Sequence, residues 1–216
     1  MKWMFAASVV ASLMGRGALG QAPDGVWEVG GMVMLARDEG LFAGVPYGQS
    51  TTLVGGAAGV RIGPVFGHVT GLRGTLPAGK GLAERSLTDM EFRGGVLAMH
   101  LISAEVSLWL REYDGVESVQ RWAGILVGAG VQGALVPGLF YVRAALRFGP
   151  RVASSIPALS LNQSWQGETE ISCQPDRIPI RIALGYRMDR LDVNEAGGAL
   201  WNMRLSGLTA RLQFRW

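Results

Sequence analysis

Cysteine, histidine and lysine are scarce in this chain. A single cysteine, Cys173, among 216 residues excludes a framework of internal disulfide bonds. The only histidines are His68 and His100, which leaves little material for acid–base or metal chemistry. Charged residues make up 17% of the chain and hydrophobic residues 49%, a balance that an ordinary water-facing surface would not show. Part of the surface is therefore expected to contact something other than water.

The N-terminus has the pattern of a secretory signal peptide. Lys2 precedes an apolar run from Trp3 to Met14, and Ala18-Leu19-Gly20 supplies small residues for cleavage. The run is shorter than the roughly 20 residues of a membrane-spanning helix, so a retained membrane anchor is the weaker alternative. We assign residues 1–20 to a signal peptide and 21–216 to one domain, because no linker or low-complexity tract divides them. After removal of the signal peptide, bases and acids nearly balance, so the basic pI does not indicate nucleic-acid binding.

The last nine residues, from Leu208 to Trp216, alternate with a period of two. Leu208, Ala210, Leu212, Phe214 and Trp216 share one face, opposite Thr209, Arg211, Gln213 and Arg215. This stretch resembles the closing strand of the small bacterial outer-membrane β-barrel family, in its OmpA/OmpX-like or porin-like forms, where the final residue is commonly Phe or Trp. The resemblance implies an outer-membrane location, contact with the lipid bilayer and lipopolysaccharide, and recognition of this strand by the outer-membrane assembly machinery.

Ten segments of the mature chain read as strands. They cover residues 25–37, 51–62, 65–76, 89–102, 104–113, 118–136, 139–148, 167–174, 177–191 and 199–216. Short connections (Gly63-Pro64, Ser103, Pro137-Gly138, Pro175-Asp176) alternate with long ones (37–50, 77–87, 113–118, 149–166, 192–198), as periplasmic turns and external loops do. The pattern predicts an all-β, closed, antiparallel up-and-down transmembrane barrel of ten strands. Eight strands remain an alternative, because 167–174 is short enough to belong to a loop.

Residues 123–142 contain no charge and would pass as a transmembrane helix by hydropathy. Internal glycines and Pro137-Gly138 argue against a helix. The residues after this turn also alternate, with Arg143 and Arg147 on one face, so two strands are predicted.

The polar faces of the predicted strands should line the inside of the barrel. Since side chains largely fill a bore this narrow, a packed network of arginine and glutamate is expected, and a narrow polar conduit that favours anions is the alternative. Pairing of the first and last strands places Glu28 near Arg215 or Arg211, and a two-residue turn sets Glu170 opposite Arg181. The Gly94-Gly95 pair leaves the facing of its strand open. The predicted network comprises Glu28, Arg61, Glu105, Arg111, Arg143, Arg147, Glu168, Glu170, Arg181, Arg187, Arg211 and Arg215.

Aromatic side chains near strand ends favour the membrane–water interface. The predicted interface aromatics are Trp27, Phe140, Phe148, Tyr186, Phe214 and Trp216.

The sequence offers no catalytic motif. His68 and His100 have no adjacent serine, and no Gly-x-Ser-x-Gly elbow, zincin helix or phosphate loop occurs. No cofactor, catalytic residue or metal site is predicted, although loop acids such as Asp114 and Asp192 are candidates for bridging cations to lipopolysaccharide. The expected function is that of a structural, adhesive or narrow-pore barrel. A lipid-modifying barrel enzyme and a soluble periplasmic barrel that binds a small ligand are the alternatives.

Overall fold

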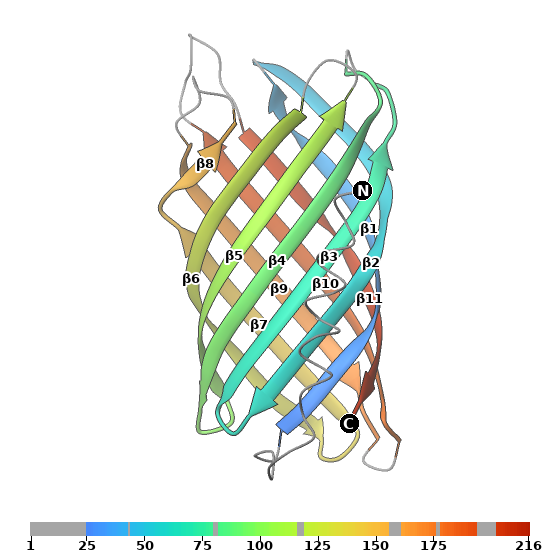
Figure 1. Cartoon of the computed structure of the whole chain (residues 1–216), viewed down its shortest axis with the longest axis vertical. Coiled ribbons are helices and arrows are strands. Elements are labelled where there is room, and N and C mark those ends of the chain that lie inside the picture. Colours follow the sequence, from blue (N-terminus) through green and yellow to red (C-terminus); the bar gives the residue numbers. More distant parts are fainter. Residues whose placement is uncertain are drawn as a thin grey trace, which may run out of the picture.

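The computed structural model describes residues 25–42, 44–79, 82–115, 119–155, 161–175, 178–193 and 202–216. The described residues form eleven β-strands (Figure 1), which are β1 (Gly25–Phe42), β2 (Val45–Ile62), β3 (Val65–Leu76), β4 (Arg85–Ala98), β5 (Ile102–Gly115), β6 (Val119–Val136), β7 (Phe140–Gly149), β8 (Val152–Ser154), β9 (Leu161–Cys173), β10 (Ile180–Val193) and β11 (Asn202–Arg215). The predicted signal peptide lies outside the described residues.

Ten of these strands close into a ring. Each strand pairs antiparallel with the next in the chain, and β1 closes the ring by pairing with β11 from Glu28↔Arg215 to Leu41↔Asn202. The three-residue β8 follows β7 at the loop end and lies between β6 and β9, with which it pairs. Strand β9 pairs along its length with both β7 and β10, which excludes the eight-strand alternative. The predicted closed antiparallel barrel of ten strands is confirmed.

The barrel has two different ends, visible at the bottom and top of Figure 1. The short-turn end carries the C-terminal Trp216 and the connections 63–64, 99–101, 137–139 and 174–179, and the loop end carries the others. Two predicted turns are wrong. The chain turns at Met99 and His100, whose φ values are 51° and 60°, whereas Ser103 lies within β5. The connection at Pro175 is longer than two residues, because β9 ends at Cys173 and β10 begins at Ile180.

Two predicted loops at the loop end are largely strand. Residues 37–50 were expected to form a loop, but β1 runs to Phe42 and β2 resumes at Val45, with Gly44 at a φ of 81° between them. The predicted loop 149–166 likewise contains β8 and the start of β9. Of the predicted loop 192–198, the first two residues belong to β10 and the rest lie outside the described residues.

The strands are longer than a membrane requires. Eighteen residues of β1 at about 3.3 Å each, tilted by about 40°, rise about 45 Å, against an apolar band of about 25 Å in outer-membrane barrels. The outward side chains accordingly change from apolar to polar along a strand. On β4 they are Phe92 and Val96 in the half near the short-turn end, and Ser86 and Thr88 in the half near the loop end. The inward face changes in the opposite sense, so the half near the loop end has a buried apolar interior that includes Leu53, Leu76, Leu87 and Leu205.

The uncharged segment 123–142 forms parts of β6 and β7. Nowhere in the described ranges is there a helix long and apolar enough to cross a membrane.

Candidate functional site

Inward-facing side chains of the barrel carry balanced charge. Eight arginines and eight carboxylates of the described chain point inward, and each forms an ion pair with another of the set. We call this set the bore network. Its members are Arg85, Arg93, Arg111, Arg143, Arg147, Arg181, Arg187 and Arg211 with Glu28, Asp38, Asp89, Glu91, Glu105, Glu168, Glu170 and Asp189.

At the centre of the network, opposite walls of the barrel touch. Arg187 Nη1 lies 2.9 Å from Asp89 Oδ2, although β10 and β4 stand half the ring apart. Arg111 Nη2 lies 2.9 Å from Asp89 Oδ1 and 2.5 Å from Asp189 Oδ2. Asp189 also accepts a 2.7 Å hydrogen bond from Arg187 Nη2. Direct contacts therefore bridge the bore at this level.

A second cluster of ion pairs lies between this centre and the short-turn end. Glu168 receives three arginines, namely Arg93 at 2.6 Å, Arg147 at 2.7 Å and Arg143. Glu105 from β5 pairs with Arg147 at 2.8 Å and with Arg143. The cluster joins β4, β5, β7 and β9, so it also spans the interior instead of lining one wall.

The seam between the first and last strands has its own ion pairs. The predicted proximity of Glu28 and Arg215 holds for the backbone, where the two residues are register partners. The carboxylate of Glu28 nevertheless pairs with Arg181, at 3.2 Å, and the second partner of Arg181 is Glu170, at 2.6 Å. Glu170 also pairs with Arg211.

The predicted register between β9 and β10 is wrong. Glu170 lies opposite Gly185, not Arg181, because the connection before β10 is longer than predicted. Arg181 still reaches Glu170, because its long side chain extends along the strand toward it.

Two predicted members do not join the bore network. Arg61 is the second-last residue of β2. Its Nε donates a hydrogen bond to the carbonyl of Gly63 at 3.2 Å, and its Nη2 lies 3.4 Å from His100 Nδ1. Arg215, at the end of β11, makes no ion pair with any residue of the described ranges. Both lie at the short-turn end, where a charge can remain in contact with water.

A cluster near the loop end was missed by sequence reasoning. The buried carboxylate of Asp38 accepts hydrogen bonds from Arg85 at 3.0 Å, Tyr113 at 3.2 Å and Tyr47 at 3.4 Å. The Arg85 guanidinium lies over both tyrosine rings, 4.8 Å from the centroid of Tyr113 and 5.4 Å from that of Tyr47. Asp38 and Tyr47 escaped notice because they fall in the segment expected to be a loop.

Four further members could have been found from the sequence. Asp89, Glu91 and Arg93 alternate on one parity of β4, but the Gly94-Gly95 pair left their facing open. In the structure, β3 and β5 pair with β4 across Gly94 and Gly95 without a register shift. The alternation of β4 is therefore unbroken, and Asp89, Glu91 and Arg93 all face inward. Asp189 lies two residues after Arg187 on the same inward face of β10, so the position of Arg187 predicts that of Asp189.

The predicted interface aromatics divide between the two ends. Trp27, Phe140, Phe214 and Trp216 lie at the short-turn end and are 37–58% exposed on the outside. Backbone hydrogen bonds of 2.9 and 3.1 Å tie Trp27 to Trp216. Phe148 lies toward the loop end, where it packs against Trp165 at 4.6 Å between ring centroids, and Tyr186 is 40% exposed on β10.

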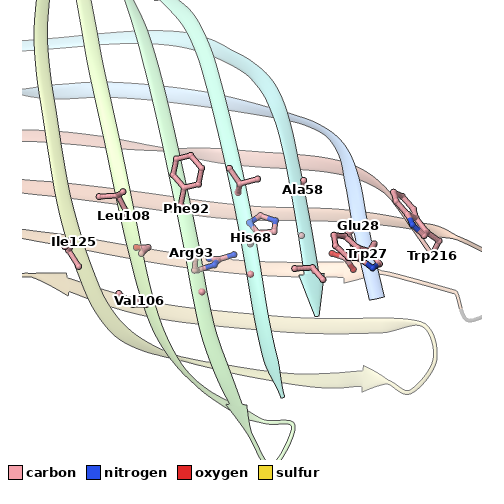
Figure 2. Close-up of a pocket in the computed structure, with 16 residues that line it drawn as sticks. Trp27, Glu28, Ala58, His68, Phe92, Arg93, Val106, Leu108, Ile125 and Trp216 are labelled. Atoms are coloured by element: carbon pink, nitrogen blue, oxygen red, sulfur yellow. The ribbon is translucent and has the colours of Figure 1, made fainter. Parts of the chain in front are cut away.

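A hollow of about 540 Å³ lies on the outer wall near the short-turn end (Figure 2). Outward side chains such as Trp27, Phe92 and Leu108 surround a floor that contains Gly67 and Gly94, so it is an apolar groove facing the region where lipid would lie.

Neither histidine meets a serine or carboxylate in the described contacts. His68 faces inward beside this groove and is the register partner of Arg93, and His100 contacts Arg61. No group of three or more potential metal ligands occurs in the part of the chain that the structure describes. Cys173 is a free thiol at the end of β9.

No family model and no curated protein sequence matches the chain. Solved structures do match it. The outer-membrane protease OmpT from Escherichia coli is 9% identical, with a TM-score of 0.53 over 93% of this chain and 99% of that one. The translocator domain of the autotransporter NalP from Neisseria meningitidis is 14% identical, with a TM-score of 0.46 over 99% and 94%. An outer-membrane channel from Pseudomonas putida F1 is 10% identical, with a TM-score of 0.41 over 93% and 98%.

At these identities the likeness concerns the fold alone. The fold is that of outer-membrane β-barrels, and the likeness does not single out the OmpA/OmpX-like or porin-like forms.

Proposed function

We propose that the protein is a structural barrel of the outer membrane whose bore is filled and does not conduct solutes. The observation that carries this proposal is the 2.9 Å contact between Arg187 and Asp89 from opposite walls. Buried side chains of the loop-end half, including Leu53, Leu87 and Leu205 at 0% exposure, fill the bore above it. A passage would have to break ion pairs or displace apolar side chains.

The charge balance argues against a narrow conduit that favours anions. Such a conduit needs arginines whose charge is available to a passing ion. In the bore network each arginine already faces a carboxylate, and Glu168 alone receives three of them. The remaining arginines with an inward parity, Arg61 and Arg215, stand at the rim. We therefore favour a structural role over a narrow pore.

The proposed location is the outer membrane, with the short-turn end in the periplasm. The outward apolar side chains of β11, from Leu208 to Trp216, cover the nine or so residues that a tilted strand needs to cross a bilayer. Closure of the ring leaves no unpaired strand edge in lipid. Recognition of this strand by the assembly machinery, contact with lipopolysaccharide and export by a signal peptide are parts of the same proposal.

Catalysis is not part of the proposal. Acyl transfer by a hydroxyl requires a base beside the nucleophile and a group that orients the base. His68 and His100 instead lie next to Arg93 and Arg61.

A liposome-swelling experiment tests the filled bore. Proteoliposomes with the folded barrel are diluted into isotonic arabinose, glycine or potassium chloride, and their swelling is followed by light scattering. We expect the rates of protein-free liposomes for all three solutes, whereas liposomes with a general porin swell fast. Swelling that depends on the amount of barrel would contradict the proposal.

A further inference from the structure

Two exposed arginines stand directly opposite each other on the outer face near the loop end. Arg190 of β10 and Arg204 of β11 are register partners, and their side chains are 60% and 46% exposed. Like charges directly opposite each other on one face of a sheet are destabilising. Nothing in the bore explains the pair, since both side chains point outward.

Nearby acids do not neutralise this face. Arg190 Nε pairs with Asp192 at 2.7 Å, and Arg204 Nη1 lies 3.5 Å from Glu39. Glu39 is shared, because Arg37 binds it at 2.7 Å. Three arginines on adjacent strands thus face two carboxylates, which leaves one positive charge and several guanidinium N–H donors for an anion.

The pair borders a surface hollow of about 410 Å³. Glu39, Gly40 and Leu41 line one side of it, and Met188, Arg190 and Arg204 contribute to the other. Toward the membrane, the same strands continue with outward apolar side chains that include Leu35, Leu184 and Leu208, each about 60% exposed. Tyr186 lies between these side chains and Arg204, and interacts with Arg204 and Ser206.

We infer that Arg190 and Arg204 form a binding site for the phosphate group of an outer-leaflet lipid. Guanidinium groups bind phosphate oxygens through paired hydrogen bonds, and two of them on neighbouring strands can hold one phosphate between them. The acyl chains of the same molecule would lie along Leu184 and Leu208, which is why a membrane lipid fits better than a free anion. The inference rests on the proposed function, because it needs the loop end to face the outer leaflet.

Lipid binding is measured by native mass spectrometry of the full chain in detergent, with bisphosphorylated lipid A as the probe. We expect R190Q/R204Q to bind lipid A at least about tenfold more weakly than the wild type, since two charge-assisted contacts are lost. The matched control is R73Q/R121Q, which removes two outward arginines from β3 and β6. Its affinity should stay within about twofold of the wild type. Equal loss in both variants, or no loss in R190Q/R204Q, would overturn the site.

A stability readout separates ligand binding from a structural role. Without lipid A, R204Q should be at least as stable as the wild type in urea, because it removes a like-charge pair. With lipid A, the wild type should gain stability and R204Q should gain less. Should R190Q/R204Q not fold, R190K/R204K keeps the charge and removes the paired hydrogen bonds, and it should still bind lipid A more weakly than the wild type.

Inorganic phosphate distinguishes a lipid from a free anion. At concentrations equal to those of lipid A, it should leave the lipid A complex intact, and displacement would contradict a lipid site. The swelling experiment on the same preparations is independent of this site. If the liposomes do not swell but R190Q/R204Q binds lipid A as well as R73Q/R121Q does, the lipid site alone is rejected. If the liposomes swell and R190Q/R204Q alone loses affinity for lipid A, the filled bore alone is rejected.

Discussion

Asp89 and Arg187 reach across the barrel from opposite walls and meet at 2.9 Å. Asp89 also pairs with Arg111, so one carboxylate holds two guanidinium groups in a buried position. Removing one partner of a buried ion pair leaves an uncompensated charge, which is more costly than losing the pair as a whole.

The first prediction concerns this contact. D89N should lower the free energy of unfolding by about 3 kcal/mol, and D89N/R187Q should cost less than the sum of the single variants. Urea unfolding of the barrel in detergent, followed by tryptophan fluorescence, measures both. E112Q is the control, because Glu112 belongs to an exposed pair with Arg121 whose loss should cost under about 1 kcal/mol. Similar costs for D89N and E112Q would show that the bore contact is not important for stability.

The second prediction compares two glycines of neighbouring strands. A Cβ on Gly55 would lie 1.8 Å from the carbonyl oxygen of Gly71, whereas a Cβ on Gly71 would meet no atom within 4 Å. G55A should therefore reduce the yield of folded barrel strongly, and G71A should fold like the wild type. The heat-modifiable band on a gel reports the folded fraction. Normal folding of G55A would refute the close approach of β2 and β3 at this point.

The third prediction locates the membrane boundary with two valines of β6. Val127 lies on the outward face within the apolar band, and Val119 lies beyond Arg121 near the loop end. Arginine in the middle of a bilayer costs about 2–4 kcal/mol, so V127R should destabilise the barrel in lipid vesicles by about that amount. V119R should change stability by less than about 1 kcal/mol. Equal losses of stability in V127R and V119R would place the loop-end half inside the membrane.

The change of chemistry along the strands explains which elements were predictable. In the half that would cross the bilayer, lipid-facing side chains are apolar and inward ones are charged, and this alternation identified the strand at Leu208–Trp216 and the inward position of Arg143 and Arg147. Near the loop end, the segment 37–50 has polar outward side chains such as Arg37 and Glu39, and the glycines at positions 40, 44 and 48 interrupt its alternation. Residues 37–50 therefore resembled a loop, although Asp38 and Tyr47 are buried inside a strand pair.

Which charged side chains form ion pairs inside the bore depends on how the closed ring brings the strands together. The sequence indicated that Glu105 and Arg147 face inward, and the structure brings them to 2.8 Å. It could not indicate that Arg187 meets Asp89, because that contact requires the curvature of the whole barrel. The predicted register of Glu170 was wrong for a local reason, because the length of the connection after Cys173 determines this register.

The fourth prediction concerns the two histidines. Because His68 lies opposite Arg93 and His100 contacts Arg61, H68A/H100A should leave the lipid A of the host membrane unchanged. Mass spectrometry of lipid A from cells with the wild type, the variant or no barrel makes the comparison. Lipid A that is modified with the wild type but not with the variant would favour an enzyme.

Single-channel recording in planar bilayers tests the filled bore most directly. The wild-type barrel should insert without steady conductance in 1 M KCl. A general porin inserted under the same conditions serves as the comparison, and we expect conductance steps from the porin alone. A stable, anion-selective conductance from the wild type would contradict the account.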